Sequence, residues 1–182
     1  MGGISLYRNI LCMTVVVMAL FMGTALAAPR AMTVDDAVIA GIAPGSDLSY
    51  VRSIYGEPDG EKTKRTGNYP THLVDYYGEG FVITYDIFGG AQNPLIQSIE
   101  STNAALVMPS GIHVGMKIAE VQQIFSDIQE PFRRDEKNNQ YTSPRFYVEV
   151  SDEKKGIRTV VFDVDKKGVI QKIFIYDRYG ID

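Results

Sequence analysis

The sequence predicts an α+β fold of two tandem units, each a short helix packed on an antiparallel sheet of three to four strands. The first observation behind this prediction is an internal repeat, in which residues 41–56 recur as residues 111–126, at an offset of seventy and without a gap. The second is a shorter repeat, in which residues 95–99 are similar to residues 169–173. The third is that segments rich in β-branched and aromatic residues follow each copy, as is typical of strands.

Each copy of the repeat has the spacing of a short amphipathic helix. Apolar residues at positions 48, 51, 54 and 55 correspond to those at 118, 121, 124 and 125. Ser46 or Asp47 can cap the first helix, and Gly56 suits its C-terminal end. We therefore expect two helices, each of about two to three turns.

Three strands are expected after each helix. In the first unit they are residues 72–77, 81–87 and 95–100, and in the second unit residues 145–150, 157–164 and 169–176. The links at 152–156 and 165–168 end in glycine and are typical of hairpin turns. A further strand or helix is expected at residues 33–39. The predicted organisation is a first repeat over 28–102, a junction at 103–110 and a second repeat over 111–182, whose sheets join edge to edge or share a core.

Residues 1–27 have the pattern of a signal peptide. Arg8 provides a positive charge before the apolar run 10–20, and Ala25-Leu26-Ala27 provides the small residues of a cleavage site. Cleavage after Ala27 predicts export, to the periplasm or the extracellular medium, with no stable membrane anchor afterwards. Retention of this segment as an anchor is the alternative, although its apolar run is short for spanning a bilayer.

Cleavage would also change the composition of the chain. It removes Cys12, the single cysteine, so the exported protein would have no disulfide. It removes Arg8 as well, which leaves 17 basic residues against 22 acidic ones and a net charge of −5. Nucleic acid is therefore not an expected partner, because phosphate binding needs a concentrated positive field.

No pattern of residues indicates catalysis or a metal site. The two histidines, His72 and His113, are far apart in sequence, whereas zinc needs three or four ligands. Residues 163–168 begin like a calcium loop, but position 5 is Lys167 and position 12 is Phe174, so a hairpin turn explains them better. Neither a Gly-x-Ser-x-Gly elbow nor a phosphate loop occurs. We predict that the chain is not an enzyme and has no cofactor and no metal.

Tyrosines in and beside the predicted strands suggest a contact surface, because tyrosine is favoured at interfaces. On the strand 145–150, alternation places Phe146, Val148 and Val150 on one face. Arg145, Tyr147 and Glu149 then lie on the other face. These three residues are the predicted protein-contact residues, with Tyr147 as the main one.

Both units share a glycine, a helix with regularly spaced apolar residues, and a strand meander. The residues that carry this pattern are Gly45, Leu48, Val51, Tyr55, Gly56 and Pro58, then Gly115, Ile118, Val121 and Phe125, with the strand-end pairs Tyr85-Asp86 and Phe162-Asp163. The pattern resembles the tandem-repeat fold of the β-lactamase-inhibitor proteins (BLIP-like). It is also similar to the single unit of the SmpA/OmlA lipoproteins of outer-membrane barrel assembly. The disulfides of the former and the lipidated cysteine of the latter have no counterpart here.

The resemblance implies a protein that binds another protein through an exposed sheet face and loops. The sequence accordingly predicts an exported, non-catalytic protein-binding module of envelope or inhibitor-like type. Two alternatives remain open. One is a small-ligand carrier or hydrolase with a site between the repeats, near residues 103–110, and the other is a structural component of the envelope.

Overall fold

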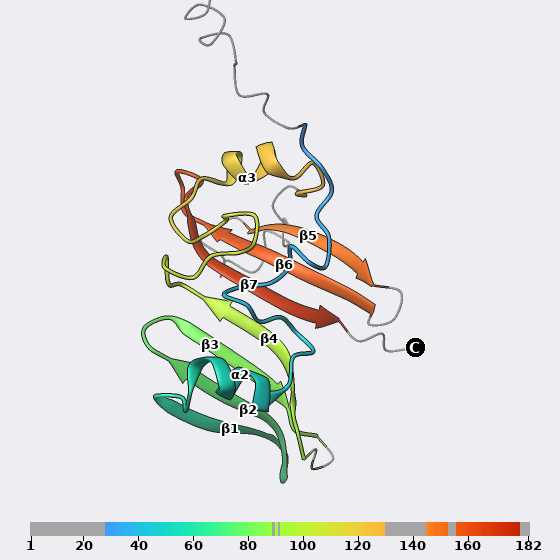
Figure 1. Cartoon of the computed structure of the whole chain (residues 1–182), viewed down its shortest axis with the longest axis vertical. Coiled ribbons are helices and arrows are strands. Elements are labelled where there is room, and N and C mark those ends of the chain that lie inside the picture. Colours follow the sequence, from blue (N-terminus) through green and yellow to red (C-terminus); the bar gives the residue numbers. More distant parts are fainter. Residues whose placement is uncertain (1–27, 89, 91, 130–144, 153–155, 179–182) are drawn as a thin grey trace, which may run out of the picture.

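Seven strands form one continuous antiparallel sheet in the computed structural model, which describes residues 28–88, 90, 92–129, 145–152 and 156–178 (Figure 1). Their order across the sheet is β1-β2-β3-β4-β7-β6-β5. The strands are β1 (Gly60–Thr66), β2 (Tyr69–Tyr77), β3 (Phe81–Asp86), β4 (Leu95–Ser101), β5 (Arg145–Asp152), β6 (Gly156–Val164) and β7 (Ile170–Arg178). Over the described residues, two helices accompany the sheet, α2 (Leu48–Tyr55) and α3 (Ile118–Ile124). The predicted signal peptide lies outside these residues.

The predicted fold class, two tandem helix-plus-sheet units, is wrong. β4 of the first half pairs with β7 of the second half, from Ser98↔Tyr176 to Ser101↔Ile173, so the sheet runs unbroken through both halves. Each of these strands would otherwise leave a row of backbone N–H and C=O groups without partners, and pairing satisfies both rows at once. The helices are also too small to cover separate sheets, since α2 buries Val51 and α3 buries two residues.

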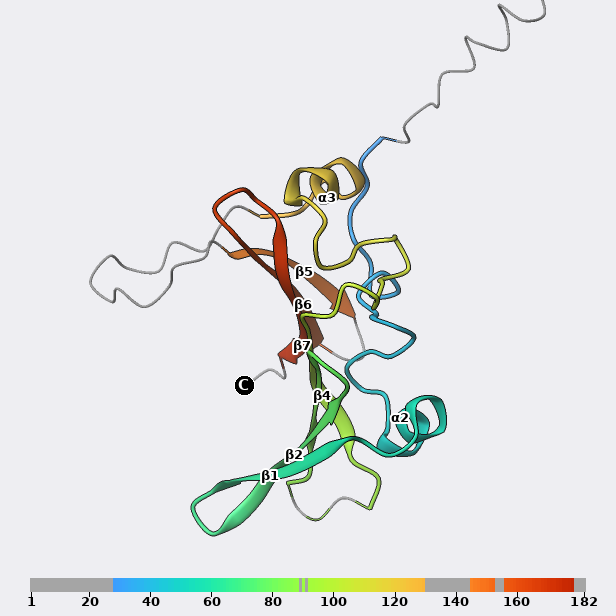
Figure 2. The same ribbon diagram turned by 90° about the vertical axis from the view of Figure 1, so that its left-hand side faces the viewer.

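One face of the sheet is covered mainly by irregular segments. Figure 2 shows residues 28–47, α2, the loop 102–117 and α3 on the same side of the sheet. Their buried residues are Met32, Ala37, Ile39, Ile42, Val51, Met108, Ile112, Ile118, Val121 and Phe125, and they share a core with Ile83, Tyr85, Ile96, Ile99, Val148, Val160, Phe162, Ile173 and Ile175 of the sheet. The core therefore lies on this side. We call the opposite side of the sheet the open face.

The two copies of the internal repeat make the same contact in the structure. In each copy, the loop before the helix is hydrogen-bonded to the last strand of that half of the chain, β4 in the first half and β7 in the second. The Gly45 N–H donates to the Ile96 carbonyl at 2.8 Å, and the Gly115 N–H donates to the Ile170 carbonyl at 2.8 Å. Both glycines have a positive φ, 85° and 98°, which other residues adopt at an energetic cost. The turn conformation therefore accounts for glycine at the same position of both copies.

Both predicted helices are confirmed, each with about two turns. Asp47 caps α2, because its side chain accepts a hydrogen bond from the Tyr50 N–H at 2.7 Å. Gly56 ends the same helix with φ 75°. At the start of α3 the Glu120 carboxylate accepts from the Lys117 N–H at 2.9 Å. In the described part of the chain, neither helix has the length and apolar content required to cross a membrane.

All six predicted strands are confirmed, with ends that differ by at most three residues. The hairpin turn at 165–168 is also confirmed, since the Gly168 N–H donates to the Asp165 carbonyl at 3.0 Å. β1 was not predicted, because its residues are polar and almost all exposed, and it forms by pairing with the edge of β2. Residues 34–36 form a turn and Ile39 forms a single bridge with Ile42, so the strand or helix expected at residues 33–39 is wrong.

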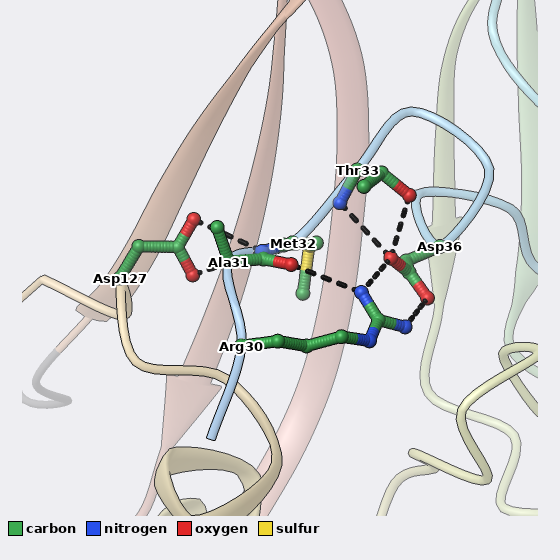
Figure 3. A network of polar contacts seen from close by, with 6 residues as sticks. All are labelled: Arg30, Ala31, Met32, Thr33, Asp36 and Asp127. Carbon is green, nitrogen blue, oxygen red and sulfur yellow. Dashed lines mark hydrogen bonds and ion pairs between the residues drawn. The ribbon is translucent and has the colours of Figure 1, made fainter. Parts of the chain in front are cut away.

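A polar network holds the N-terminal covering segment against the end of α3 (Figure 3). Arg30 forms a bidentate ion pair with Asp36, with N···O distances of 2.7 and 2.6 Å. Asp36 also accepts from the backbone N–H and hydroxyl of Thr33. The Met32 N–H donates to both carboxylate oxygens of Asp127 at 3.1 Å, which joins residues 95 positions apart. This network keeps the cover in place over the core.

The Asp36 ion pair predicts a loss of stability in acid. The hydrogen bonds from Arg30 lower the pKa of Asp36 from 3.8 to about 2. Because the folded pKa lies below the unfolded one, the stabilisation is complete above about pH 4 to 5 and is lost as the pH falls through 2. We expect it to amount to about 1 to 2 kcal/mol, since Arg30 is half exposed.

The measurement is urea unfolding of the wild type and of Asp36→Asn between pH 2 and 6. The difference between the two free energies of unfolding should shrink towards pH 2. Asp35→Asn is the matched control, because Asp35 is exposed. A difference that stays constant over this range would contradict the prediction.

Candidate functional site

The open face carries rows of side chains that run across the strands. The register places seven residues, one from each strand, in one row in the order Tyr147, Val161, Phe174, Glu100, Val82, Tyr76 and Gly60. The neighbouring row is Glu149, Thr159, Tyr176, Ser98, Thr84, Val74 and Lys62. The first row is mainly aromatic and aliphatic, with Glu100 as its single charge. The second row is mainly polar.

Two hollows lie next to each other on this face and share two lining residues. The first has a volume of about 500 Å³ and is lined by Glu100, Arg145, Tyr147, Glu149, Thr159, Val161, Asp163, Lys172, Phe174 and Tyr176. The second, of about 510 Å³, is lined by Lys64, His72, Val74, Tyr76, Val82, Thr84, Gln97, Ser98, Glu100 and Phe174. Glu100 and Phe174 line both, at the point where β4 pairs with β7. We call the two together the groove.

A chain of ion pairs lies along one side of the first hollow. Arg145 Nε is 2.7 Å from one carboxylate oxygen of Asp163, and Lys172 Nζ is 3.4 Å from the other. Lys172 Nζ is also 3.2 Å from Glu100. Both cations of this hollow are therefore already engaged with its carboxylates.

Aromatic rings form much of the apolar surface of the groove. The rings of Phe174 and Tyr176 stack with their centroids 5.0 Å apart and an angle of 29° between their planes. At the far end of the groove, Lys62 Nζ lies 5.4 Å from the ring centroid of Tyr76, which is a cation–π contact. The open face thus carries large aromatic groups, which are enriched at protein interfaces, beside charged ones.

The three residues predicted as protein contacts lie together on the open face. Arg145, Tyr147 and Glu149 all line the first hollow. Tyr147 is half-buried between its neighbours, while the other two are exposed. Sequence reasoning missed the opposite wall of this hollow, formed by Phe174, Tyr176 and Glu100. Alternation along β7 would have grouped the two rings, but only the β4–β7 pairing brings Glu100 beside them.

The histidines and acids of the described residues do not form a metal site, since no group of three or more potential ligands converges there. His72 lines the second hollow, with Nδ1 3.0 Å from the Thr71 hydroxyl. His113 lies outside both hollows, with Nδ1 2.9 Å from the Gly111 carbonyl. Residues 103–110, where a site between the repeats was expected, contribute no lining residue to either hollow.

Buried charges on the covered side have arginine partners, which indicates a structural role. Arg52 of α2 reaches the fully buried Asp75 at 3.2 Å, and it also pairs with Glu57 and Glu61. Burial raises the pKa of Asp75, and the nearby Arg52 opposes that rise. Perturbed acids often mark functional sites, but Asp75 lies outside both hollows described above.

Comparisons with protein-family models, with curated proteins and with solved structures found no match for this chain. The resemblance to the inhibitor-like tandem-repeat proteins therefore stays a prediction. The groove on the open face is the feature from which a function can be inferred.

Proposed function

We propose that this chain is an exported, non-catalytic module that binds another protein through the groove on the open face. Among the described residues, the segments that cover the sheet lie on one of its faces (Figure 2). The observation that carries the proposal is that the other face has a groove lined by aromatic and aliphatic residues together with charged ones. Buried tyrosine and phenylalanine anchors supply much of the binding energy of protein interfaces.

The size of the open face suits a protein partner. Seven strands at a spacing of about 4.8 Å span about 29 Å, which is enough for one side of an interface of standard size. The groove is also spread over two hollows, whereas a small-molecule site is a single concave pocket that buries most of its ligand. These features favour a protein over the alternative of a small-ligand carrier.

The charged groups of the groove favour binding over catalysis. Arg145 and Lys172 lie in ion pairs with Asp163, an arrangement that sets the orientation of a partner. Export is inferred from the signal-like sequence of residues 1–27, and it places the partner in the periplasm or the extracellular medium. The net charge of −5 expected after cleavage disfavours nucleic acid as that partner.

Photocrosslinking in the native host tests the proposal. A photoreactive phenylalanine analogue replaces Phe174 in the groove, and in the matched control it replaces Phe88, which is 70% exposed and lies outside the groove. We expect a discrete adduct with one protein from position 174 and none from position 88. The absence of an adduct at position 174, or the same adduct at both positions, would count against the groove.

Once the partner is captured, substitution measures the contribution of the predicted contact. Tyr147→Ala is expected to weaken partner binding about tenfold, because truncating a half-buried interface tyrosine removes both area and a polar contact. Tyr69→Ala is the control, since Tyr69 is 72% exposed and lines neither hollow. Titration by calorimetry gives both dissociation constants, and equal losses in the two variants would contradict the assignment.

A further inference from the structure

The hairpin of β1 and β2 is a basic segment in an acidic chain. Residues 62–72 contain Lys62, Lys64 and Arg65 and no aspartate or glutamate, whereas the whole chain has a net charge of −4. All three cations are exposed. Figure 2 shows the hairpin reaching away from the covering segments, towards the side of the open face. Positive charge is therefore concentrated at one end of the sheet.

No carboxylate of the described residues forms an ion pair with these three cations. Lys62 lies over the ring of Tyr76, a contact that leaves its positive charge without a counter-ion. Lys64 lines the second hollow of the groove. The β1 end of the open face therefore carries two cations that an incoming anion can neutralise.

The carboxylates of β1 to β4 already have partners. Glu61 and Asp75 both pair with Arg52 at 3.2 Å. Glu100 lines the second hollow but pairs with a lysine of β7 at 3.2 Å. Asp86 accepts a hydrogen bond from a backbone N–H at 2.8 Å. An incoming carboxylate can therefore approach the cations of the hairpin without displacing an ion pair.

β1 also lies at the end of the sheet, so one of its edges is unpaired. Among the described strands its single neighbour is β2. Extended segments of partner proteins add to such edges through main-chain hydrogen bonds. Lysines on an edge strand oppose pairing with another basic strand. A strand with carboxylates at alternate positions instead places them opposite Lys62 and Lys64, about 5 Å away between Cβ atoms. The edge thus disfavours a second copy of itself and favours an acidic strand.

We propose that the partner protein presents an extended acidic segment that pairs with the outer edge of β1, with its carboxylates beside Lys62 and Lys64. A lipid surface fits less well, because lipid recognition uses clusters of four or more basic residues and the chain as a whole is negative. This inference rests on the proposed function, which it deepens by naming the chemistry of the partner at the β1 end of the groove.

The test is selection of random dodecapeptides displayed on phage against the immobilised full chain. We expect selected peptides to be enriched in aspartate or glutamate, and replacement of these residues by asparagine or glutamine to lower affinity at least tenfold. Enrichment of basic peptides, or no enrichment at all, overturns the inference. Binding to phosphatidylglycerol vesicles but to no acidic peptide overturns it too. Apolar peptides also overturn it, but they leave the groove as a docking surface, which the adduct at position 174 tests separately.

Substitutions in the chain locate the bound peptide. Lys62→Gln/Lys64→Gln should weaken a selected acidic peptide about threefold to tenfold, because it removes both facing cations. Lys166→Gln/Lys167→Gln is the matched control, since it removes the same charge from an exposed turn outside both hollows. We expect the control to change affinity less than twofold. Equal losses in the two variants would mean that the peptide responds only to net charge, and the inference would be wrong.

Backbone methylation of the peptide tests the pairing with β1. Alternate N–H groups of a strand point to opposite edges, so only one set can donate to β1. Methylating the nitrogens of one set should lower affinity at least tenfold, while methylating the other set should change it little. If neither set matters, the segment does not add to the edge of β1, which overturns the proposed mode of binding.

Discussion

Replacing Asp177 with asparagine is expected to lower the free energy of unfolding by about 3 to 5 kcal/mol. Asp177 and Arg158 form a bidentate pair, with N···O distances of 2.7 and 3.1 Å, and their side chains are 4% and 8% exposed. The substitution keeps the shape of Asp177 but leaves a buried guanidinium without its counter-ion. Such a loss is a large part of the stability of a typical domain.

The position of this pair explains why its loss should affect the whole fold. Arg158 also donates to the Pro44 carbonyl at 2.7 Å, so it ties β6 and β7 of the second half to the covering segment that leads into α2. Urea denaturation measures the effect. The double substitution Arg158→Met/Asp177→Leu is the control, since it removes both charges and should cost much less than the single change. A loss below about 1 kcal/mol in Asp177→Asn would contradict this account.

Phe162→Ala is expected to destabilise the protein by about 3 to 5 kcal/mol, because it removes a large side chain from the centre of the core and leaves a cavity. Phe162 is fully buried on β6, directly opposite Phe146 and Ile173. Phe162→Leu leaves a smaller cavity and should cost less. Phe88→Ala is the matched control, and we expect it to change stability by less than about 0.5 kcal/mol, because Phe88 is mostly exposed.

Thermal and urea unfolding of the three phenylalanine variants give the order of stability. The expected order is Phe88→Ala, then Phe162→Leu, then Phe162→Ala as the least stable. Equal stability of the two alanine variants would mean that the core does not lie where the structure places it.

Local sequence patterns located the secondary structure well. The two helices and six strands lie where spacing and residue preference predicted them, because each pattern depends on residues only a few positions apart. β1 shows the limit of this reasoning. Its residues, among them Lys62 and Lys64, are exposed and show no alternation, so it is a strand only because β2 offers a free edge.

The fold class could not be predicted correctly from these patterns. Pairing of β4 with β7 joins residues about 75 positions apart, and no local pattern specifies which edges meet. The cover was also not visible in the sequence, since residues 28–47 and 102–117 are largely irregular and bury isolated residues such as Ile39 and Met108. The prediction therefore had the two helices, of eight and seven residues, cover the sheet, whereas in the structure these loops cover most of it.

The candidate site, like the fold, could be predicted only in part from the sequence. Alternation along one strand was enough to group Arg145, Tyr147 and Glu149, because every second residue of a strand points to the same face of the sheet. The environment of these residues needed the full sheet. Glu100 and Phe174 reach them only through the strand order β4-β7-β6-β5.

The amino-acid sequence by itself therefore determined the positions of both helices and six strands, the glycines of the repeated turns and the faces of individual strands. These properties follow from backbone preferences and from side-chain periodicity over short distances. Only the tertiary structure decided that the two halves share one sheet, which face is covered, and which residues meet in the groove. Those outcomes depend on long-range pairing, in which strand edges find partners and a single apolar face is buried from water.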